Sequence, residues 1–462
     1  MLLKKYTVFI LAVFGLASIL ILSTCAGAGT VSLASSTAIV YLPSILKQPS
    51  PTPLPTATMT PTPISGPFSG AITTFSLSKK GGSDVIPHQI VRTGDDRLYI
   101  FGYQGDQSKT LVGYWTTSPG LPASSSGFAG SISPLTYPAN IISVDVVYDG
   151  SSTIHVITNT ADGNLVDRPF NIVSNTFATA QILANNAATP GAGMYVGTSG
   201  VSAGMDMSGI LHIAYWSSGN HITYLAYDPS TKGYSPVSGP TVLDSSGNAN
   251  HPSLAVSPFD QSVTVAWVSQ ATNPAQILAR TRIQGGSWGS IQKVSAAPVW
   301  TSTNNGINID QGPSLIIDGG GVRHLTYIEN FTASNVYGRI HYVVNSGSGW
   351  SDTNTGFYSH DPGLALSTTG GLYIVGHGYD NLDPAPCNSM QIMCVIKKNS
   401  DGSWGPPQAV VTPSGSSSYD SSPSIKWSVM GFNRPDVIEF IFPEVISGDY
   451  SNTILHYARI GP

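Results

Sequence analysis

A short polar turn followed by one aromatic residue recurs along this chain and limits what it can fold into. In the clearest copy, Asn399-Ser400-Asp401-Gly402 precedes Trp404. Looser copies precede six other aromatic residues, namely Phe68, Phe128, Phe177, Tyr234, Trp288 and Trp350. Such turn residues tolerate the tight backbone of a hairpin, and the aromatic can begin the next strand and cover the core of a neighbouring unit. The spacing of roughly 56 residues per unit is typical of solenoids and propeller blades.

The composition favours strands over helices. Only 10% of the 462 residues are charged, and the chain contains 49 Gly and 33 Pro. Among its acidic residues only Glu329, Glu439 and Glu444 are glutamates, so good surface-helix formers are scarce. An all-β chain with many short strands is therefore predicted.

Three further strands align in each unit. The expected innermost strands are 88–91, 144–147, 204–207, 252–256, 313–317, 362–366 and 423–427. The expected second strands are 98–103, 154–158, 211–216, 263–268, 323–328, 372–377 and 437–442, and third strands include 222–228, 277–283, 339–344 and 454–460.

The two ends of the repeat region complement each other. The last unit supplies three strands before the sequence ends, whereas the strand expected at 68–77 has no unit of its own. Placed fourth in the last sheet, this strand closes a ring and leaves no large sheet edge exposed. We predict a β-propeller of seven four-stranded blades closed by an N-terminal strand, with six blades as the alternative.

The sequence before the repeats predicts export. Residues 1–28 combine a basic start with a long apolar run, as in an export signal. Lipidation at Cys25, cleavage after Ala26-Gly27-Ala28 and an uncleaved anchor all fit the end of this segment. Residues 29–48 are unassigned, 49–64 form a Pro/Thr-rich spacer, and 65–462 form the propeller domain. The expected location is outside the cell, secreted or anchored to the outer side of the cell membrane.

Charge and cysteine content restrict the partners. A formal net charge of −5 leaves no basic face for phosphates, so nucleic acid is not an expected partner. Beyond the signal only Cys387 and Cys394 remain, and an exported compartment permits a disulfide between them. Two thiols without a nearby His give too few ligands for a metal site. No cofactor is predicted, with Ca²⁺ kept as an alternative that no motif supports, and we expect a monomer.

The turn of Ser400, Asp401, Gly402 and Trp404 resembles the Asp box, the Ser-x-Asp-x-Gly-x-x-Trp hairpin of sialidase-like β-propellers. The resemblance covers this turn well in the order of its residue types, which lie closer together here, and covers the other six loosely. It implies a propeller fold and an arginine triad, a Tyr–Glu nucleophile pair and an Asp acid in a sialidase site. The first family Arg lies in an Arg-Ile-Pro motif, and Val85 occupies that position here. Arg92, Arg97, Arg323, Arg339 and Arg434 lack a matching motif. No catalytic residue is therefore assigned.

Two other patterns favour structural interpretations. Asp149 with His155, Asp206 with His212, and Asp318 with His324 each span a hairpin within one unit, which favours turn chemistry over a shared metal site. Gly-x-Ser-x-Gly occurs at 200–204 and 285–289, but a nucleophile elbow needs a strand entering a helix, and neither site has one.

The ligand face of a propeller lies opposite its Asp-box turns. In units five to seven this face should gather carboxylates and tyrosines, and the ligand-binding candidates are Asp310, Tyr327, Glu329, Asp361, Tyr379, Asp380, Asp420 and Glu444. Paired carboxylates could act on a glycosidic bond, or bind sugar hydroxyls or Ca²⁺ without chemistry, or serve only as turn residues. Aromatic rings could stack on sugar faces.

These observations predict an exported propeller that binds a ligand, with carbohydrate as the expected ligand class. A sialidase-like glycoside hydrolase with a divergent site is the first alternative, and if the chain is an enzyme this is the expected class. A structural scaffold for envelope proteins is the second alternative, because propellers serve many unrelated functions.

Overall fold

The structure, a computed structural model, describes residues 72–80, 88–103, 108–189, 200–235, 239–299, 312–329, 338–359, 362–378, 383–388, 392–410, 437–446 and 449–461. The chain divides into two compact units, Met1–Thr62 and Pro63–Pro462, and every described residue belongs to the second. The predicted signal with Cys25, the unassigned stretch and the spacer lie outside the described residues. Within the described part, no helix is long and apolar enough to span a membrane.

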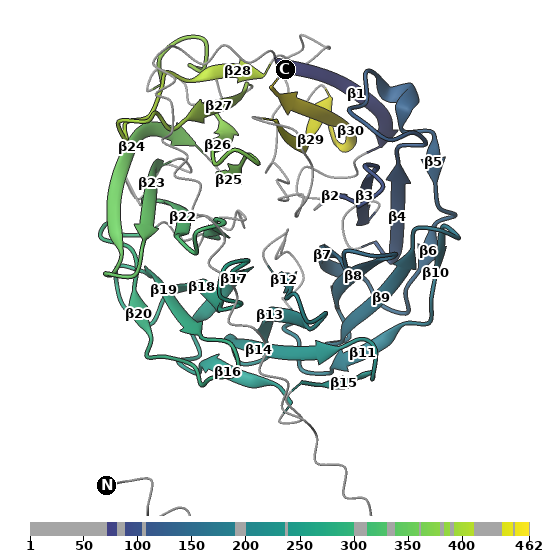
Figure 1. Ribbon diagram of the computed structural model, residues 1–462, viewed down its shortest axis with the longest axis horizontal. Helices are drawn as coiled ribbons and strands as arrows, with labels where there is room; N and C mark the ends of the chain where they lie inside the picture. Colours follow the sequence, from purple (N-terminus) through teal and green to yellow (C-terminus); the bar gives the residue numbers. More distant parts are fainter. Residues whose placement is uncertain are drawn as a thin grey trace, which may run out of the picture. The chain divides into compact units, whose positions relative to one another are not determined.

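Seven antiparallel sheets follow one another around a ring (Figure 1). Blade 1 contains β2 (His88–Arg92), β3 (Leu98–Tyr103), β4 (Thr110–Trp115), β5 (Gly130–Ser131) and β6 (Leu135–Thr136), with the 3₁₀ turn η1 (Ser125–Gly127) before β5. Blade 2 contains β7 (Ile141–Tyr148), β8 (Thr153–Thr160), β9 (Leu165–Asn171), β10 (Thr176–Phe177) and β11 (Gln181–Ala184). Blade 3 contains β12 (Val201–Met205), β13 (Leu211–Ser217), β14 (His221–Asp228), β15 (Gly233–Tyr234) and β16 (Thr241–Asp244).

The remaining blades continue the same order. Blade 4 contains β17 (Ala249–Val256), β18 (Val263–Ser269), β19 (Gln276–Arg282) and β20 (Gln292–Lys293). Blade 5 contains β21 (Ser314–Ile317), β22 (Arg323–Ile328), β23 (Gly338–Asn345) and β24 (Ser351–Ser359). Blade 6 contains β25 (Gly363–Leu366), β26 (Leu372–His377), β27 (Met393–Lys397) and β28 (Gln408–Val410). Blade 7 contains β29 (Ile438–Ile446), β30 (Asp449–Ile460) and β1 (Ile72–Lys80).

The predicted closure by an N-terminal strand is confirmed. β1 pairs antiparallel with β30, and the register places Ile72 opposite Ile460 and Thr73 opposite Arg459. Residue Phe68 and the expected innermost strand of blade 7 lie outside the described residues. The seven-bladed, all-β prediction holds, and the alternative of six blades is wrong.

The second strand of each blade is the part that the sequence locates best. β3, β22 and β26 have the bounds expected from their apolar runs. β3, β13 and β18 are buried along their whole length. Strands covered on both faces by neighbouring sheets carry near-continuous hydrophobic runs, which is why these segments stand out.

The expected innermost strand at 204–207 is placed wrongly, because β12 spans Val201–Met205. Asp206 ends this strand by turn formation. Its Oδ1 accepts hydrogen bonds from the backbone N–H groups of Ser208 and Ile210, at 2.8 and 3.0 Å. Gly209 supplies the positive φ of +78° that completes the turn.

Hydrophobic clusters shared by successive blades hold the ring together. Seven of the buried clusters each combine residues from two neighbouring blades, and the last of them joins blade 7 to blade 1 through Leu77, Tyr457 and Phe128. The innermost strands add hydrogen bonds between blades. Ser202, for example, accepts from the Leu254 N–H at 2.9 Å, and Ser253 accepts from the Leu315 N–H at 3.1 Å.

The repeated turn aromatics reach the preceding blade. Trp404 of blade 6 meets Tyr342 of blade 5 edge to face at 5.3 Å, and Trp288 of blade 4 meets Tyr224 of blade 3 at 4.8 Å. Phe128 and Phe177 contact aromatic rings of the preceding blade. Tyr234 and Trp350 donate hydrogen bonds to the preceding blade, and Trp350 also packs against the hydrophobic cluster shared by blades 4 and 5. The predicted role of these residues, covering a neighbouring core, is confirmed for five of the six that the structure describes. Tyr234 is 36% exposed and reaches the preceding blade only through its hydroxyl.

Candidate functional site

The ring has two faces that differ in their connections. The hairpins between first and second strands, and between third and fourth strands, lie on what we call the lower face. The opposite end of the strands, where the second strand ends and the third begins, is what we call the upper face. The turn at Asp401 lies on the lower face, and its carboxylate accepts from the Ser403 N–H at 2.9 Å.

Two of the predicted Asp–His pairs form the same arrangement on the lower face. In blade 3, His212 contacts the Asp206 carboxylate at 3.2 Å through Nε2 and the Tyr224 hydroxyl at 2.6 Å through Nδ1. In blade 5, His324 makes the equivalent contacts with Asp318 and Tyr342, at 3.3 and 2.7 Å. Each pair stays within its own blade, which supports a structural role.

The third pair does not form. Asp149 caps its own turn by accepting from Ser151, Ser152 and Thr153, at 2.8 to 3.0 Å. His155 instead contacts the buried Asp167 carboxylate at 2.8 Å. Within the described residues, no group of three or more His, Cys, Asp or Glu side chains is arranged to hold a metal ion.

Within blade 5, four polar side chains converge from β22, β23, β24 and Glu329, the residue that follows β22. Tyr327 is fully buried on β22 and donates its hydroxyl to Oδ2 of Asp352 on β24, at 2.5 Å. His341 on β23 contacts Oδ1 of Asp352 at 2.7 Å through Nδ1 and Oε2 of Glu329 at 3.3 Å through Nε2. The Tyr327 and His341 rings stack at 5.0 Å. We call these four residues the blade-5 cluster.

The preceding blade helps to fix this cluster. The backbone N–H groups of Ala296 and Ala297, on the connection from blade 4, donate to Oδ2 of Asp352 at 2.6 Å and to the Tyr327 hydroxyl at 3.1 Å. Asp352 is thus saturated and only 6% exposed, whereas the Glu329 side chain is 20% exposed. Glu329 is therefore the carboxylate of the cluster that can meet a ligand.

The electrostatics of the cluster reinforce this division. Burial alone would lower the pKa of His341, but the hydrogen bonds and negative charges of Asp352 and Glu329 outweigh it and raise that pKa. Burial alone would raise the pKa of Asp352, but its bonds from His341, Tyr327 and the Ala296 N–H lower it. Burial and the neighbouring carboxylate raise the pKa of Tyr327. These shifts favour an ionised Asp352 and a protonated Tyr327, and they make His341 easier to protonate.

Arg339 and Tyr358 extend the cluster toward blade 6. They are register partners on β23 and β24, and the Arg339 Nε donates to the Tyr358 hydroxyl at 2.8 Å. The Glu329 N–H donates to the Arg339 carbonyl at 2.9 Å, which brings the carboxylate-bearing residue next to the guanidinium-bearing one. Gly338 permits this approach, because a Cβ there would overlap the Glu329 carbonyl oxygen.

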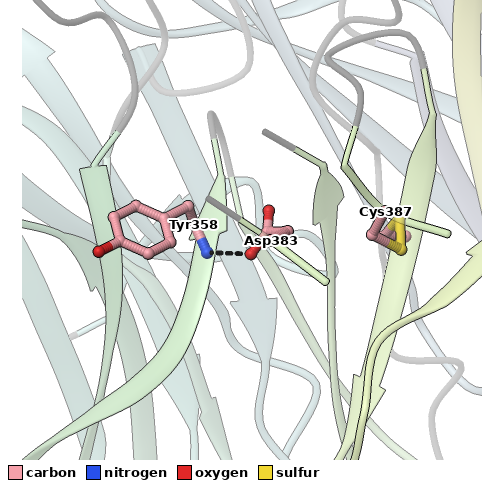
Figure 2. The surroundings of a disulfide bond; sticks show 4 residues. Tyr358, Asp383 and Cys387 are labelled. Atoms are coloured by element: carbon pink, nitrogen blue, oxygen red, sulfur yellow. Dashed lines mark hydrogen bonds between the residues drawn. A yellow bond between two sulfur atoms is a disulfide. The ribbon is translucent and has the colours of Figure 1, made fainter. Parts of the chain in front are cut away.

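The loop between β26 and β27 of blade 6 borders the same region. Oδ1 of Asp383 accepts from the Tyr358 backbone N–H at 3.0 Å, and the Tyr358 ring points away from this carboxylate (Figure 2). The buried Cys387 of the same loop forms a disulfide with Cys394 on β27, with the two Cα atoms 6.1 Å apart. The predicted disulfide is confirmed, and it ties the segment that follows Asp383 to β27.

The described arginines near the first blade and the lower face are engaged within the fold. Arg92 is 1% exposed and forms a two-pronged ion pair with Glu439, with its Nε 2.9 Å from Oε2. Arg97 pairs with Asp95, and Arg323 donates to Thr264 at 2.8 Å and to Ser262. These three arginines do not assemble into a triad. Arg434 lies outside the described residues.

The structure describes only some of the predicted ligand-binding residues. Tyr327 and Glu329 come together in the blade-5 cluster, where Tyr327 is buried behind Glu329. Glu444 lies on β29, but its side chain is outside the described residues. Asp310, Asp361, Tyr379, Asp380 and Asp420 also lie outside the described residues.

Sequence reasoning missed His341, Asp352, Arg339 and Tyr358 as members of one site. The alternation Arg339-x-His341 on an expected third strand was a usable signal, because residues two apart on a strand share a face. The contribution of Asp352 had no local signal, since it depends on the pairing of β23 with β24.

The protein is therefore a seven-bladed β-propeller, and polar and aromatic side chains lie together on its upper face. No protein-family model matches the chain, and no curated protein matches it. Among solved structures, the BP39L lectin from Burkholderia pseudomallei is similar, with a TM-score of 0.55 and 13% identity over 82% of this chain and 96% of the lectin.

Two other solved structures show weaker similarity. The β-propeller domain of the Trilobed protease from Pyrococcus furiosus has a TM-score of 0.42 and 9% identity over 81% of this chain and 95% of its own. AofleA from Arthrobotrys oligospora has a TM-score of 0.41 and 10% identity over 74% of this chain and 89% of its own. Identities this low show the fold alone. The narrower resemblance to sialidase-like Asp-box propellers stays a prediction.

Proposed function

We propose that this protein is a carbohydrate-binding propeller whose ligand contacts the upper face of blade 5 and its border with blade 6. The observation that carries the proposal is that Glu329 and Arg339 are neighbours with an attractive charge interaction, and that Arg339 contacts Tyr358. A carboxylate, a guanidinium and an aromatic ring thus share one part of that face. Carboxylates and guanidinium groups pair with sugar hydroxyls as acceptor and donor, and aromatic rings offer apolar surface to sugar C–H groups. The fold similarity to a bacterial lectin supports the same conclusion.

A binding role is better supported than hydrolysis. Both oxygens of Asp352 already accept hydrogen bonds inside the fold, so Asp352 cannot serve as the partner of Glu329 on a glycosidic bond. The sialidase-like alternative rests on the turn at Asp401. It predicts sugar release from fluorogenic glycosides, and the absence of turnover across a broad panel would remove its support. The scaffold alternative predicts that cross-linking in the native envelope captures other envelope proteins and that no glycan binds.

The test is binding to a glycan array by wild type, Glu329→Ala and Tyr358→Ala. Loss of a charge-assisted hydrogen bond to a hydroxyl should weaken the best glycan by about tenfold or more in Glu329→Ala. Lys293→Gln, an exposed change on the outer strand of blade 4, serves as the matched control and should bind as wild type does. Unchanged binding in both upper-face variants would contradict the proposed site.

We also propose that the chain is exported and acts outside the cell as a monomer, either secreted or anchored to the membrane only through its N-terminal segment. The motivation is the basic and apolar stretch of residues 1–28 followed by the Pro/Thr-rich spacer. Palmitate labelling of wild type and Cys25→Ser tests the lipid anchor. Label that persists in Cys25→Ser, or no label in wild type, would refute lipidation at that residue.

A further inference from the structure

We infer that this site selects an uncharged pyranose over the corresponding acidic sugar, with Glu329 as the selecting group and His341 as the residue that positions it. The inference rests on the proposed carbohydrate-binding function and adds the charge class of the ligand. It differs from what the sialidase resemblance implies, because sialidases bind an acidic sugar through three arginines.

The balance of charge in the site carries the inference. Three carboxylates, Glu329, Asp352 and Asp383, lie within the connected set of contacts. Their described cationic neighbours are His341 and Arg339, and Arg339 already donates to Tyr358. Glu329 is the carboxylate with the greatest exposure in the blade-5 cluster, so a ligand carboxylate would approach a like charge first. Like charges at close range weaken binding even when water partly screens them.

Three described arginines that were weighed for a sialidase-like triad are committed elsewhere. Arg92 is buried against Glu439, Arg97 pairs with Asp95, and Arg323 donates to Thr264 and Ser262. None of these three makes a contact with the blade-5 cluster among the described residues. Arg339 therefore remains as the described guanidinium next to Glu329, and one guanidinium beside several carboxylates does not create an anion site.

His341 determines how Glu329 is presented. Its Nε2 is hydrogen-bonded to Oε2 of Glu329, and its Nδ1 is hydrogen-bonded to Asp352, both of whose oxygens already accept hydrogen bonds. Among the described residues, Oε1 of Glu329 makes no hydrogen bond, so this oxygen is left to accept from a ligand hydroxyl. The chain of contacts runs from the blade 4 backbone through Asp352 and His341 to Glu329, which fixes the carboxylate before a ligand arrives.

The experiment compares sugars that differ only at C6. Binding of the methyl glycosides of glucose, galactose and mannose is measured by calorimetry or ligand-observed NMR beside glucuronate, galacturonate and mannuronate. Wild type should bind the neutral member of its preferred pair about five- to tenfold more tightly than the acidic member. Glu329→Gln has nearly the same shape without the charge, and it should bring that ratio close to one.

His341→Gln separates positioning from charge. This variant retains the Glu329 carboxylate, so the neutral sugar should bind more weakly while the preference over the acidic sugar persists. Thermal unfolding of each variant verifies that it is folded. An acidic member that binds as tightly as its neutral partner, or a ratio unchanged in Glu329→Gln, would overturn the inference and leave the proposed function intact. No binding by any of the six sugars or by a glycan array would overturn both.

Discussion

His341 has both ring nitrogens next to carboxylates, Asp352 at 2.7 Å and Glu329 at 3.3 Å. Its charged form is therefore stabilised in the folded protein more than in the unfolded chain, and its pKa rises above the ordinary value of 6.5. Groups with a raised folded pKa contribute stability below the unfolded pKa and lose it as pH rises through the folded pKa. The protonation of one residue is thus coupled to folding and to the presentation of Glu329.

We expect His341→Asn to lower the free energy of unfolding by about 1–3 kcal/mol at low pH, because the buried Asp352 loses a charge-assisted partner. The difference from wild type should be largest below about pH 6.5 and shrink as pH rises through the raised pKa of His341. Urea unfolding of both proteins between pH 5 and 9 measures it. If the difference in unfolding free energy between wild type and His341→Asn grows with pH, the proposed coupling between His341 protonation and stability has the wrong sign.

At the scale of elements, the aromatic that begins each fourth strand joins two blades. Trp404 belongs to blade 6, yet it packs against Tyr342 on β23 of blade 5. The turn before it is tight because Gly402 has a φ of +88° and Asp401 accepts from the Ser403 N–H. The turn therefore sets the direction of the aromatic, and the aromatic seals the interface between sheets.

Trp404→Ala should destabilise the protein by about 2–4 kcal/mol, because it removes a large aromatic surface from the interface between blades 5 and 6. Trp404→Phe is the matched control. It keeps a ring against Tyr342 and removes an indole N–H that has no hydrogen-bond partner, so it should cost less than about 1.5 kcal/mol. Guanidinium unfolding measures both, and equal losses would contradict a role for the ring contact.

For the whole propeller, closure depends on contacts between residues far apart in the sequence. Arg92 on β2 of blade 1 is joined to Glu439 on β29 of blade 7, 347 positions away, and Tyr457 on β30 donates to the same carboxylate at 2.5 Å. Burial alone would lower the pKa of Arg92, but the negative charge and hydrogen bonds of Glu439 raise it. This buried ion pair lies at the seam between the first and last blades.

Removing one partner of this pair should cost about 3–5 kcal/mol, because the other charge stays buried and unpaired. In a double-mutant cycle of Arg92→Met and Glu439→Leu, the double variant should be more stable than the sum of the single losses predicts, by about 2 kcal/mol or more. The exposed pair Arg97 and Asp95 is the control, with a coupling below about 1 kcal/mol. Similar coupling in both pairs would refute a special role for the seam.

The sequence located features that depend on neighbours along the chain. The apolar runs of β3, β22 and β26 identified fully paired second strands, and the turn with its aromatic gave the blade repeat. The disulfide followed from the two cysteines left after the signal. The end of β12 was misplaced because a side-chain turn at Asp206 competes with strand extension.

By itself, then, the sequence determined the ring of seven sheets, because periodic burial and turn chemistry are written into each repeat. Only the tertiary structure decided which polar groups meet. Asp352, His341, Glu329 and the Ala296 N–H come from separate segments, and strand register together with the packing of blade 4 on blade 5 brings them into contact. Carboxylates that look alike in the sequence thus differ in function, since one is saturated inside the fold and another is left at the surface.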